Sequence, residues 1–198
     1  MNIMRNEVKT IQNDLEYLRQ ISKEVDFEND DWMEALQKLN NFCKNDDNIL
    51  AIASIQLGIP LRLIYIKKSK LDKFDDSNYN ESRILINPVI IKKEGLTTYW
   101  EACASCLDNM GLVQRPYKIE VEFFNDKKEK IIEIFEGFEA TVLSHEMDHL
   151  DGILHIDKSI EILQMGKEER KKYRESHPYQ IIRKEGTFLE NEEKIKKM

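Results

Sequence analysis

The sequence predicts an α+β protein in which mostly antiparallel sheets surround one buried helix, with helices before and after them. Three observations lead to this prediction. Apolar residues at helical spacing near the start give way to short β-prone segments. These segments are followed by an apolar helix that carries His145-Glu146-Met147-Asp148-His149, and then by a charged helix. Runs of strands that are separated from the helices along the chain are typical of this class.

Two helices are predicted ahead of the strands. Residues 8–21 place apolar side chains at helical spacing, which indicates one amphipathic helix. A second helix is predicted to begin near Asn29 and Asp30, because either side chain can cap the first turn. Its apolar spacing continues through Phe42.

Six short segments rich in β-branched and aromatic residues are predicted as strands. They are residues 49–55, 61–66, 84–91, 97–100, 119–124 and 131–135. The polar, acidic residues 68–82 are predicted as a loop. An apolar helix is predicted from Phe138 to Gly152, a residue type suited to the C′ position. A final charged helix is predicted over residues 160–176, since Pro178 prevents much continuation.

Composition narrows the class of protein. A chain of 198 residues predicts one domain with a sizeable core. A net charge of −7 and 34% charged residues predict solubility and argue against sequence-specific nucleic-acid binding. No apolar run approaches a membrane span, and residues 1–7 lack the apolar stretch of a signal peptide. The odd number of cysteines (Cys43, Cys103 and Cys106) indicates a reducing compartment, so we expect a cytoplasmic protein.

The run from His145 to His149 has the form H-E-x-x-H. Positions i and i+4 of a helix lie on one face, so both imidazoles can bind a single metal ion. Glu146 then lies beside the ion, where it can take a proton from water. The run predicts a metal-dependent hydrolase.

A catalytic metal site of this kind needs a third protein ligand, and the sequence offers three candidates. His155 completes H-E-x-x-H-x-x-G-x-x-H, the pattern of metzincin proteases. Glu168 lies near the spacing of glutamate-ligated zinc peptidases, although it belongs to a charged stretch in which a Glu is expected. Cys103 is the third candidate, and a lone cysteine is more often a buried core residue than a ligand.

The segment around the third candidate resembles a known family. Residues 101–105, Glu-Ala-Cys-Ala-Ser, resemble the E-G-C-L-S motif of peptide deformylases. Residues 145–152 resemble their H-E-x-D-H-L-x-G motif, and residues 51–58 resemble more loosely their G-x-G-L-A-A-x-Q-x-G motif. The three motifs occur in the family's order, and Arg115 stands where the family usually has an arginine. The resemblance runs from about residue 14 to residue 157.

The resemblance implies hydrolytic removal of the N-formyl group from the N-terminal formyl-methionine of newly made polypeptides, a step of N-terminal processing in protein biosynthesis. It implies that Cys103, His145 and His149 hold one divalent metal ion. Fe(II) is the ion expected in the cell, and zinc, nickel and cobalt are alternatives. Glu146 is implied as the general base that deprotonates water and then as the acid that protonates the leaving amine.

The same resemblance implies roles for five further residues. The Gln56 side-chain amide and the backbone N–H of Ala104 are expected to stabilise an oxyanion. The backbone near Leu50, Ala51 and Ala102 is expected to run beside the substrate peptide, which would pair with it as an added strand.

Departures from the motifs keep two alternatives open. Ile49, Ala51 and Ala102 stand where the motifs have glycine, and Cys106 places a second thiol near the motif cysteine. These changes motivate a deformylase-like binding protein with impaired catalysis. A zinc endopeptidase with His155 as its third ligand is the other alternative.

The C-terminal segment differs in charge from the rest of the chain. Residues 158–198 hold eleven Lys or Arg and eight Asp or Glu, a net charge of +3. We expect residues 1–157 to form the deformylase-like metal hydrolase domain, with residues 158–198 as a charged helix and tail of the same domain. A basic-leaning tail also suggests a contact with ribosomal RNA, although a solvated charged helix explains it as well.

Overall fold

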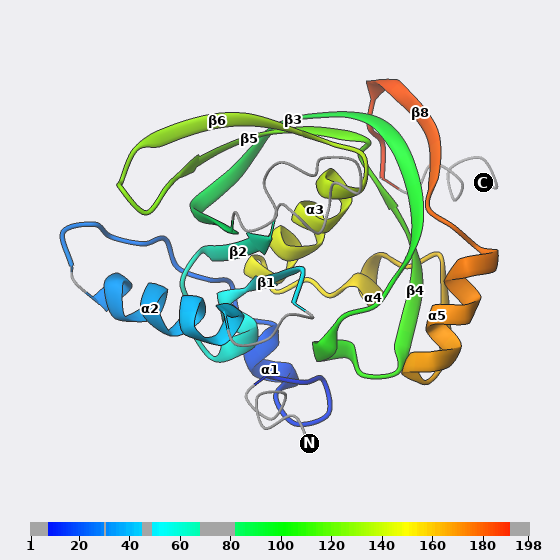
Figure 1. Cartoon of the computed structure of the whole chain (residues 1–198), viewed down its shortest axis with the longest axis horizontal. Helices are drawn as coiled ribbons and strands as arrows, with labels where there is room; N and C mark the ends of the chain where they lie inside the picture. The colour runs from blue at the N-terminus through cyan, green and yellow to red at the C-terminus, as the bar shows by residue number, and fades with distance from the viewer. Residues whose placement is uncertain (1–7, 30, 45–48, 68–81, 191–198) are drawn as a thin grey trace.

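Helix α3 (Phe138–Leu150) lies inside the molecule, between the strands that curve over it and the short strands beneath it (Figure 1). The computed structural model describes residues 8–29, 31–44, 49–67 and 82–190. All but a few residues of α3 are buried, and Leu143 and Leu150 are fully so. The predicted α+β class and the burial of this helix are therefore confirmed.

Among the described residues, eight strands form one sheet in which every pairing between the named strands is antiparallel. They are β1 (Ala51–Ala53), β2 (Leu63–Lys67), β3 (Ser82–Glu101), β4 (Asn109–Arg115), β5 (Lys118–Phe124), β6 (Lys130–Glu136), β7 (Glu161–Gln164) and β8 (Gln180–Thr187). The main path runs β1-β2-β3-β4-β7, while β5 joins β3 to β6 and β8 pairs with β3. Strand β3 thus contacts four neighbours.

Alternating side chains cover α3. In β5, Ile119, Val121 and Phe123 are buried while the residues between them are partly exposed, the pattern of a strand with one face on the core. They pack with Phe135 of β6 and Leu143 of α3. The position of α3 therefore follows from the period-two pattern of these strands.

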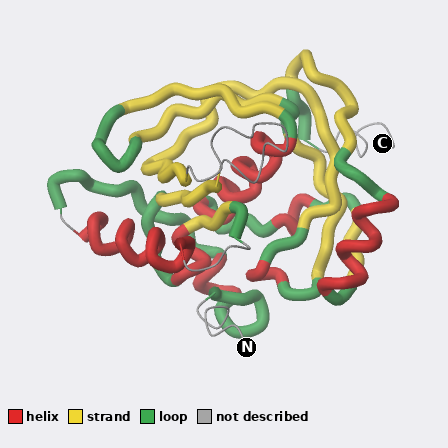
Figure 2. Tube along the Cα trace, in the orientation of Figure 1, coloured by secondary structure: helices red, strands yellow, loops and turns green. Residues whose placement is uncertain are grey.

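A second core lies under helix α2 (Asp31–Lys44), which Figure 2 shows at the surface of the molecule. Trp32 and Leu39 of this helix pack against Ile52 and Leu63. The helix was predicted to begin near residues 29 and 30. It begins at Asp31, whose backbone N–H donates to the Asn29 side chain over 3.2 Å, and residue 30 lies outside the described residues.

The predicted helix over residues 8–21 is wrong, since only α1 (Leu15–Leu18) is helical. The backbone N–H of Lys9 donates to the Gln56 carbonyl over 2.7 Å, and that of Ile11 donates to the Ser105 carbonyl over 2.8 Å. These tertiary hydrogen bonds take the place of helical ones. They hold this segment against the two loops that carry Gln56 and Cys103.

Other segments also differ from the sequence prediction. The predicted strands 84–91 and 97–100 form one continuous strand, β3, and the strand expected over 49–55 gives way after Ala53 to the 3₁₀ helix η2 (Ser54–Leu57). The helix expected over 160–176 is wrong in its first part, because β7 pairs with β4 there and only α5 (Lys167–Ser176) is helical. Strands β4 and β8 were not predicted. Most of the expected loop 68–82 lies outside the described residues, and Ser82 begins β3.

Gly152 ends the region of α3 as predicted, in a left-handed conformation with φ of 71°. A Cβ atom at this position would lie 2.4 Å from the carbonyl oxygen of Arg19. Glycine is therefore required both by the backbone conformation and by the close approach of the N-terminal segment. Within the described ranges, no helix is long and apolar enough to span a membrane.

Candidate active site

The end of α3 nearest Gly152 presents the two histidines of the H-E-x-x-H run. The His145 and His149 rings lie with their centroids 4.9 Å apart and nearly perpendicular. His149 is fully buried, and neither of its ring nitrogens has a hydrogen-bond partner among the described residues. Buried polar atoms are seldom left without a partner. This histidine therefore has the surroundings of a ligand to a group such as a metal ion.

Cys103 reaches the same place from the turn between β3 and the 3₁₀ helix η4 (Ala104–Cys106). Its Sγ and one ring nitrogen each of His145 and His149 lie within 4.8 Å of one another. A hydrogen bond from Cys106, together with the three neighbouring histidines, holds the pKa of Cys103 well below its ordinary value. One thiolate and two imidazoles are ligands that suit a divalent transition metal, so these residues fit the predicted ion.

Glu146 lies between the two histidines in sequence and is buried beside them. Burial raises the pKa of its carboxyl group, against the opposing charges of the neighbouring histidines. Its Oε2 has no hydrogen-bond partner within the described part of the chain. A buried carboxyl group with a raised pKa and a free oxygen is suited to receiving and returning a proton.

Gln56 is held between two turns. It lies in η2, where its Oε1 accepts a hydrogen bond from the backbone N–H of Ala53 over 3.1 Å. Its Nε2 donates to the Ser105 hydroxyl over 3.0 Å, which links η2 to η4. A side-chain amide has two N–H donors, so this contact leaves one for a ligand. Ala104 is exposed at the first position of η4, where a backbone N–H lacks an intrahelical partner.

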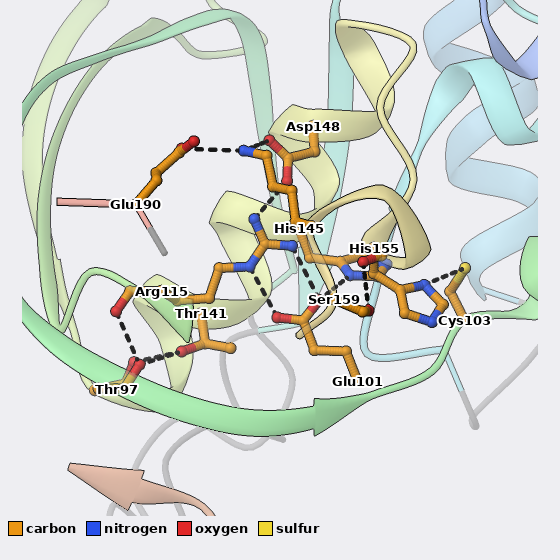
Figure 3. A network of polar contacts seen from close by, with 12 residues as sticks. Thr97, Glu101, Cys103, Arg115, Thr141, His145, Asp148, His155, Ser159 and Glu190 are labelled. Carbon is orange, nitrogen blue, oxygen red and sulfur yellow. Dashed lines mark hydrogen bonds and ion pairs between the residues drawn. The ribbon is translucent and has the colours of Figure 1, made fainter. Parts of the chain in front are cut away.

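A buried network of ion pairs contacts His145 through Glu101 (Figure 3). The Glu101 carboxylate lies 2.7 Å from His145 Nδ1 and accepts two hydrogen bonds from Arg115, of 2.8 and 2.9 Å. Arg115 also donates to Asp148, which accepts a further bond from Lys158 over 2.8 Å. Burial alone would raise the pKa of Glu101, but the Arg115 charge and its hydrogen bonds hold that pKa far below the usual range.

This network fixes the orientation of one histidine. Glu101 stays ionised and faces Nδ1 of His145, so the Nε2 nitrogen is left to face a metal ion. The sequence reasoning gave no role to Glu101. The contact could not be foreseen, because Arg115 lies in β4, which was not predicted, and the pairing of β3 with β4 brings it beside Glu101.

Two of the three expected substrate-binding residues, Leu50 and Ala51, lie at one edge of the sheet. Ala51 begins β1, which pairs with β2 on one side and ends the strand order. Leu50 precedes it, and its carbonyl accepts a hydrogen bond from Lys67 over 2.8 Å. Ala102 is partly buried in the turn that leads to Cys103. Leu50 and Ala51 thus lie at an edge of the sheet, and Ala102 lies in the turn that leads to Cys103.

His155 does not lie where it could join His145 and His149 as the third ligand. It begins the short helix α4 (His155–Lys158), is buried, and stacks on the His145 ring with centroids 5.5 Å apart. Among the described residues, its ligand atom groups with those of Cys103 and Cys106 rather than with both histidines of α3.

Comparisons with known proteins agree with this geometry. The family model described as polypeptide deformylase matches residues 6–165. The peptide deformylase of Pelagibacter ubique is 36% identical over 141 residues, which cover 71% of this chain and 78% of the relative. Peptide deformylase 2 of Clostridium acetobutylicum is 37% identical over 142 residues, or 72% and 88% of the two chains.

Solved structures give the same result. A probable peptide deformylase from Synechococcus phage S-SSM7 has a TM-score of 0.64 and 32% identity, covering 76% of this chain and 97% of that one. The Met-Ala-Ser-bound class I type b peptide deformylase of Acinetobacter baumannii has a TM-score of 0.63 and 25% identity, covering 76% and 95%. This protein therefore belongs to the peptide deformylase family, metal-dependent hydrolases that remove the N-formyl group from newly made polypeptides.

Proposed function

We propose that this chain deformylates N-terminal formyl-methionine at the site formed by Cys103, His145, His149 and Glu146. The observation that supports this most directly is the convergence of three ligand atoms within 4.8 Å beside a buried carboxyl group. A divalent ion held by three protein ligands supplies Lewis acidity and lowers the pKa of water. Fe(II) is the ion we propose for the cell, with zinc, nickel and cobalt as substitutes.

Glu146 moves the proton in this proposal. Its ionised carboxylate takes a proton from the attacking water and then returns it to the amine that leaves the formyl group. The raised pKa of Glu146 favours the first half of this cycle, because a carboxylate with a higher pKa is a stronger base toward the proton of water.

Gln56 and Ala104 stabilise negative charge on the formyl oxygen. The remaining N–H of the Gln56 amide and the backbone N–H of Ala104 are the proposed donors. The hydrogen bonds from Gln56 to Ser105 and from Ala53 to Gln56 orient the amide before the substrate arrives. Donors fixed in advance need no reorganisation during the reaction.

The peptide is proposed to bind along the edge of β1, near Leu50, Ala51 and Ala102. A strand at the end of a sheet offers N–H and C=O groups for an added strand. The relative from A. baumannii bound to Met-Ala-Ser supports a peptide ligand of this length for the family. We place the reaction in the cytoplasm, where new polypeptides are made.

The C-terminal segment completes the proposal. Residues 158–198 belong to the same domain as residues 1–157 in this view, supported by the pairing of β7 with β4 and of β8 with β3. Their net charge of +3 favours contact with ribosomal RNA. We expect the intact chain to co-sediment with ribosomes and the variant Lys171→Glu, Lys172→Glu, at two exposed positions of α5, to co-sediment less. Absence of co-sedimentation by the intact chain contradicts the contact.

The test of the proposed function is release of formate from formyl-Met-Ala-Ser. The full chain is reconstituted anaerobically with Fe(II) or Ni(II), and its metal content is measured. Metal-dependent turnover is expected. Saturable binding of the peptide without turnover, at one bound metal per chain, would instead identify a deformylase-like binding protein.

Replacement of Cys103 by alanine tests the third ligand. We expect Cys103→Ala to lose the metal during gel filtration and to lose formate release with it, because two imidazoles alone leave the ion weakly held. His155→Phe is the comparison, since it alters the other candidate ligand. Metal retention by Cys103→Ala together with metal loss by His155→Phe would reverse the assignment.

Replacement of Gln56 by leucine tests the oxyanion donor. Loss of one such donor typically lowers kcat by about 10²–10³-fold. We expect a fall in kcat of this size with one metal ion still bound per chain, measured by steady-state formate release and metal analysis. Ser105→Ala, which removes only the partner of Gln56, should give a smaller loss. An unchanged kcat in Gln56→Leu would remove Gln56 from the mechanism.

A further inference from the structure

A second cluster of metal-ligating side chains shares one member with the proposed active site. The Sγ atoms of Cys103 and Cys106 and a ring nitrogen of His155 lie within 4.8 Å of one another. Figure 3 shows the His155 ring directed at Cys103, on the side away from Arg115. The proposed deformylation uses Cys103 but assigns no role to Cys106 or His155.

The separations in this cluster suit a tetrahedral ion. With zinc bonds of about 2.3 Å to sulfur and about 2.0–2.1 Å to nitrogen, a thiolate and an imidazole on one ion lie roughly 3.6 Å apart. The distance between Cys103 Sγ and His155 Nδ1 is 3.8 Å. The two side chains are therefore placed close to the edge of such a tetrahedron without rearrangement.

The surroundings also fit a soft ion. Cys106 is fully buried and His155 is 1% exposed, and Cys106 packs with Leu18 and Leu154 in an apolar cluster. The His155 nitrogen that faces Cys103 Sγ is Nδ1, which puts a buried imidazole donor next to the two thiols. Two thiols and one imidazole are the donors that thiophilic ions such as Zn²⁺ prefer.

We propose that Cys103, Cys106 and His155 form a second metal site, selective for thiophilic divalent ions such as Zn²⁺ and Cd²⁺. Binding replaces the S–H bond of Cys106 by a metal–sulfur bond and releases that proton to water, with no change of oxidation state. This inference rests on the proposed function only in that Cys103 serves both sites.

Sharing one thiolate couples the two sites. An ion bound to Cys106 and His155 also binds the Cys103 sulfur. A sulfur shared with this second ion binds the catalytic ion less strongly. Excess zinc therefore reduces the availability of Cys103 to a catalytic Fe(II). The second site thus makes the enzyme responsive to the ratio of zinc to iron.

The test counts the thiolates that bind metal. The full chain, freed of metal under anaerobic conditions, is titrated with Cd²⁺ and followed by sulfur-to-cadmium charge-transfer absorbance in the ultraviolet. Cys106→Ser should lower the absorbance at saturation by at least half. Cys43→Ser is the matched control, since Cys43 is equally buried but lies in a different cluster, and it should leave the absorbance unchanged. Equal absorbance in wild type and Cys106→Ser would overturn the proposal.

A second measurement needs no variant. X-ray absorption of the wild-type chain with two equivalents of Zn²⁺ gives the average number of sulfur neighbours per zinc. A value above one is expected, because Cys103 alone supplies at most one sulfur per zinc even when it bridges both ions. A value of one or less overturns the second site. Failure of the proposed function is distinguishable, because it appears as binding of formyl-Met-Ala-Ser without formate release at one bound metal per chain, whatever signal Cys106 contributes.

Discussion

Replacement of Glu146 by glutamine should lower kcat for formate release by about 10²–10⁴-fold, the usual contribution of general acid–base catalysis. Glutamine keeps the size of the side chain but cannot accept the proton of water. The three proposed ligands are untouched, so one metal ion per chain should remain bound. Steady-state kinetics on formyl-Met-Ala-Ser and metal analysis of the same sample measure both quantities.

The expected pattern is specific to a proton-transfer role. The loss should fall on kcat, with little change in KM, because no peptide contact is removed. Glu139→Gln is a suitable control, since this glutamate lies in the first turn of the same helix, more than one turn before the histidines. A Glu146→Gln variant with wild-type kcat would show that another group moves the proton.

Replacement of Arg115 by methionine is expected to lower the free energy of unfolding by about 3–5 kcal/mol, the cost of breaking a buried ion pair. Arg115 is 3% exposed and lies between Glu101 and Asp148, which would both be left buried without this partner. Chemical denaturation of the metal-free variant and of the metal-free wild type measures the difference. The cost should fall when Glu101 is also replaced, as in the Arg115→Met, Glu101→Leu pair.

Arg62→Met is the matched control. Arg62 pairs with Asp151 over 2.7 Å, but the Asp151 carboxylate is half exposed, so water screens the pair. Exposed pairs contribute about 0–1 kcal/mol. Equal losses of unfolding free energy in the Arg115 and Arg62 variants would show that burial does not decide how much an ion pair contributes to stability. The Arg115 variant should also bind metal about 10–100-fold more weakly, since Glu101 then orients His145 less well.

The part of the site that lies on one helix was predictable from local sequence. Spacing by four residues puts His145 and His149 on the same face whatever surrounds them, and apolar flanks required burial. Cys103 was different, because spacing says nothing of a ligand more than forty residues away. Only its resemblance to a family motif selected it over His155, and the structure now brings it close to both histidines.

What the sequence could not predict depends on contacts between distant segments. Residues 8–21 have the apolar spacing of a helix, but most of them are not helical. The backbone N–H groups of Lys9 and Ile11 instead donate to the carbonyls of Gln56 and Ser105 in the two 3₁₀ helices. Similarly, Glu161 to Gln164 read as the start of a charged helix, yet they complete the edge of β4. The partners of Glu101 were equally hidden, since an acidic residue in a strand normally indicates only a solvated face.

The length of β3 makes part of the chain intolerant of insertion. This strand runs from its pairing with β2, past β5 and β8, to its pairing with β4, where Glu101 is its last residue. Adding one residue after Gly95 would turn Glu101 to the opposite face and leave His145 without its carboxylate. The turn between β5 and β6 carries no such role. Insertions and deletions should therefore accumulate in that hairpin. The number of residues in β3 should stay constant, because it decides on which face of the strand Glu101 lies.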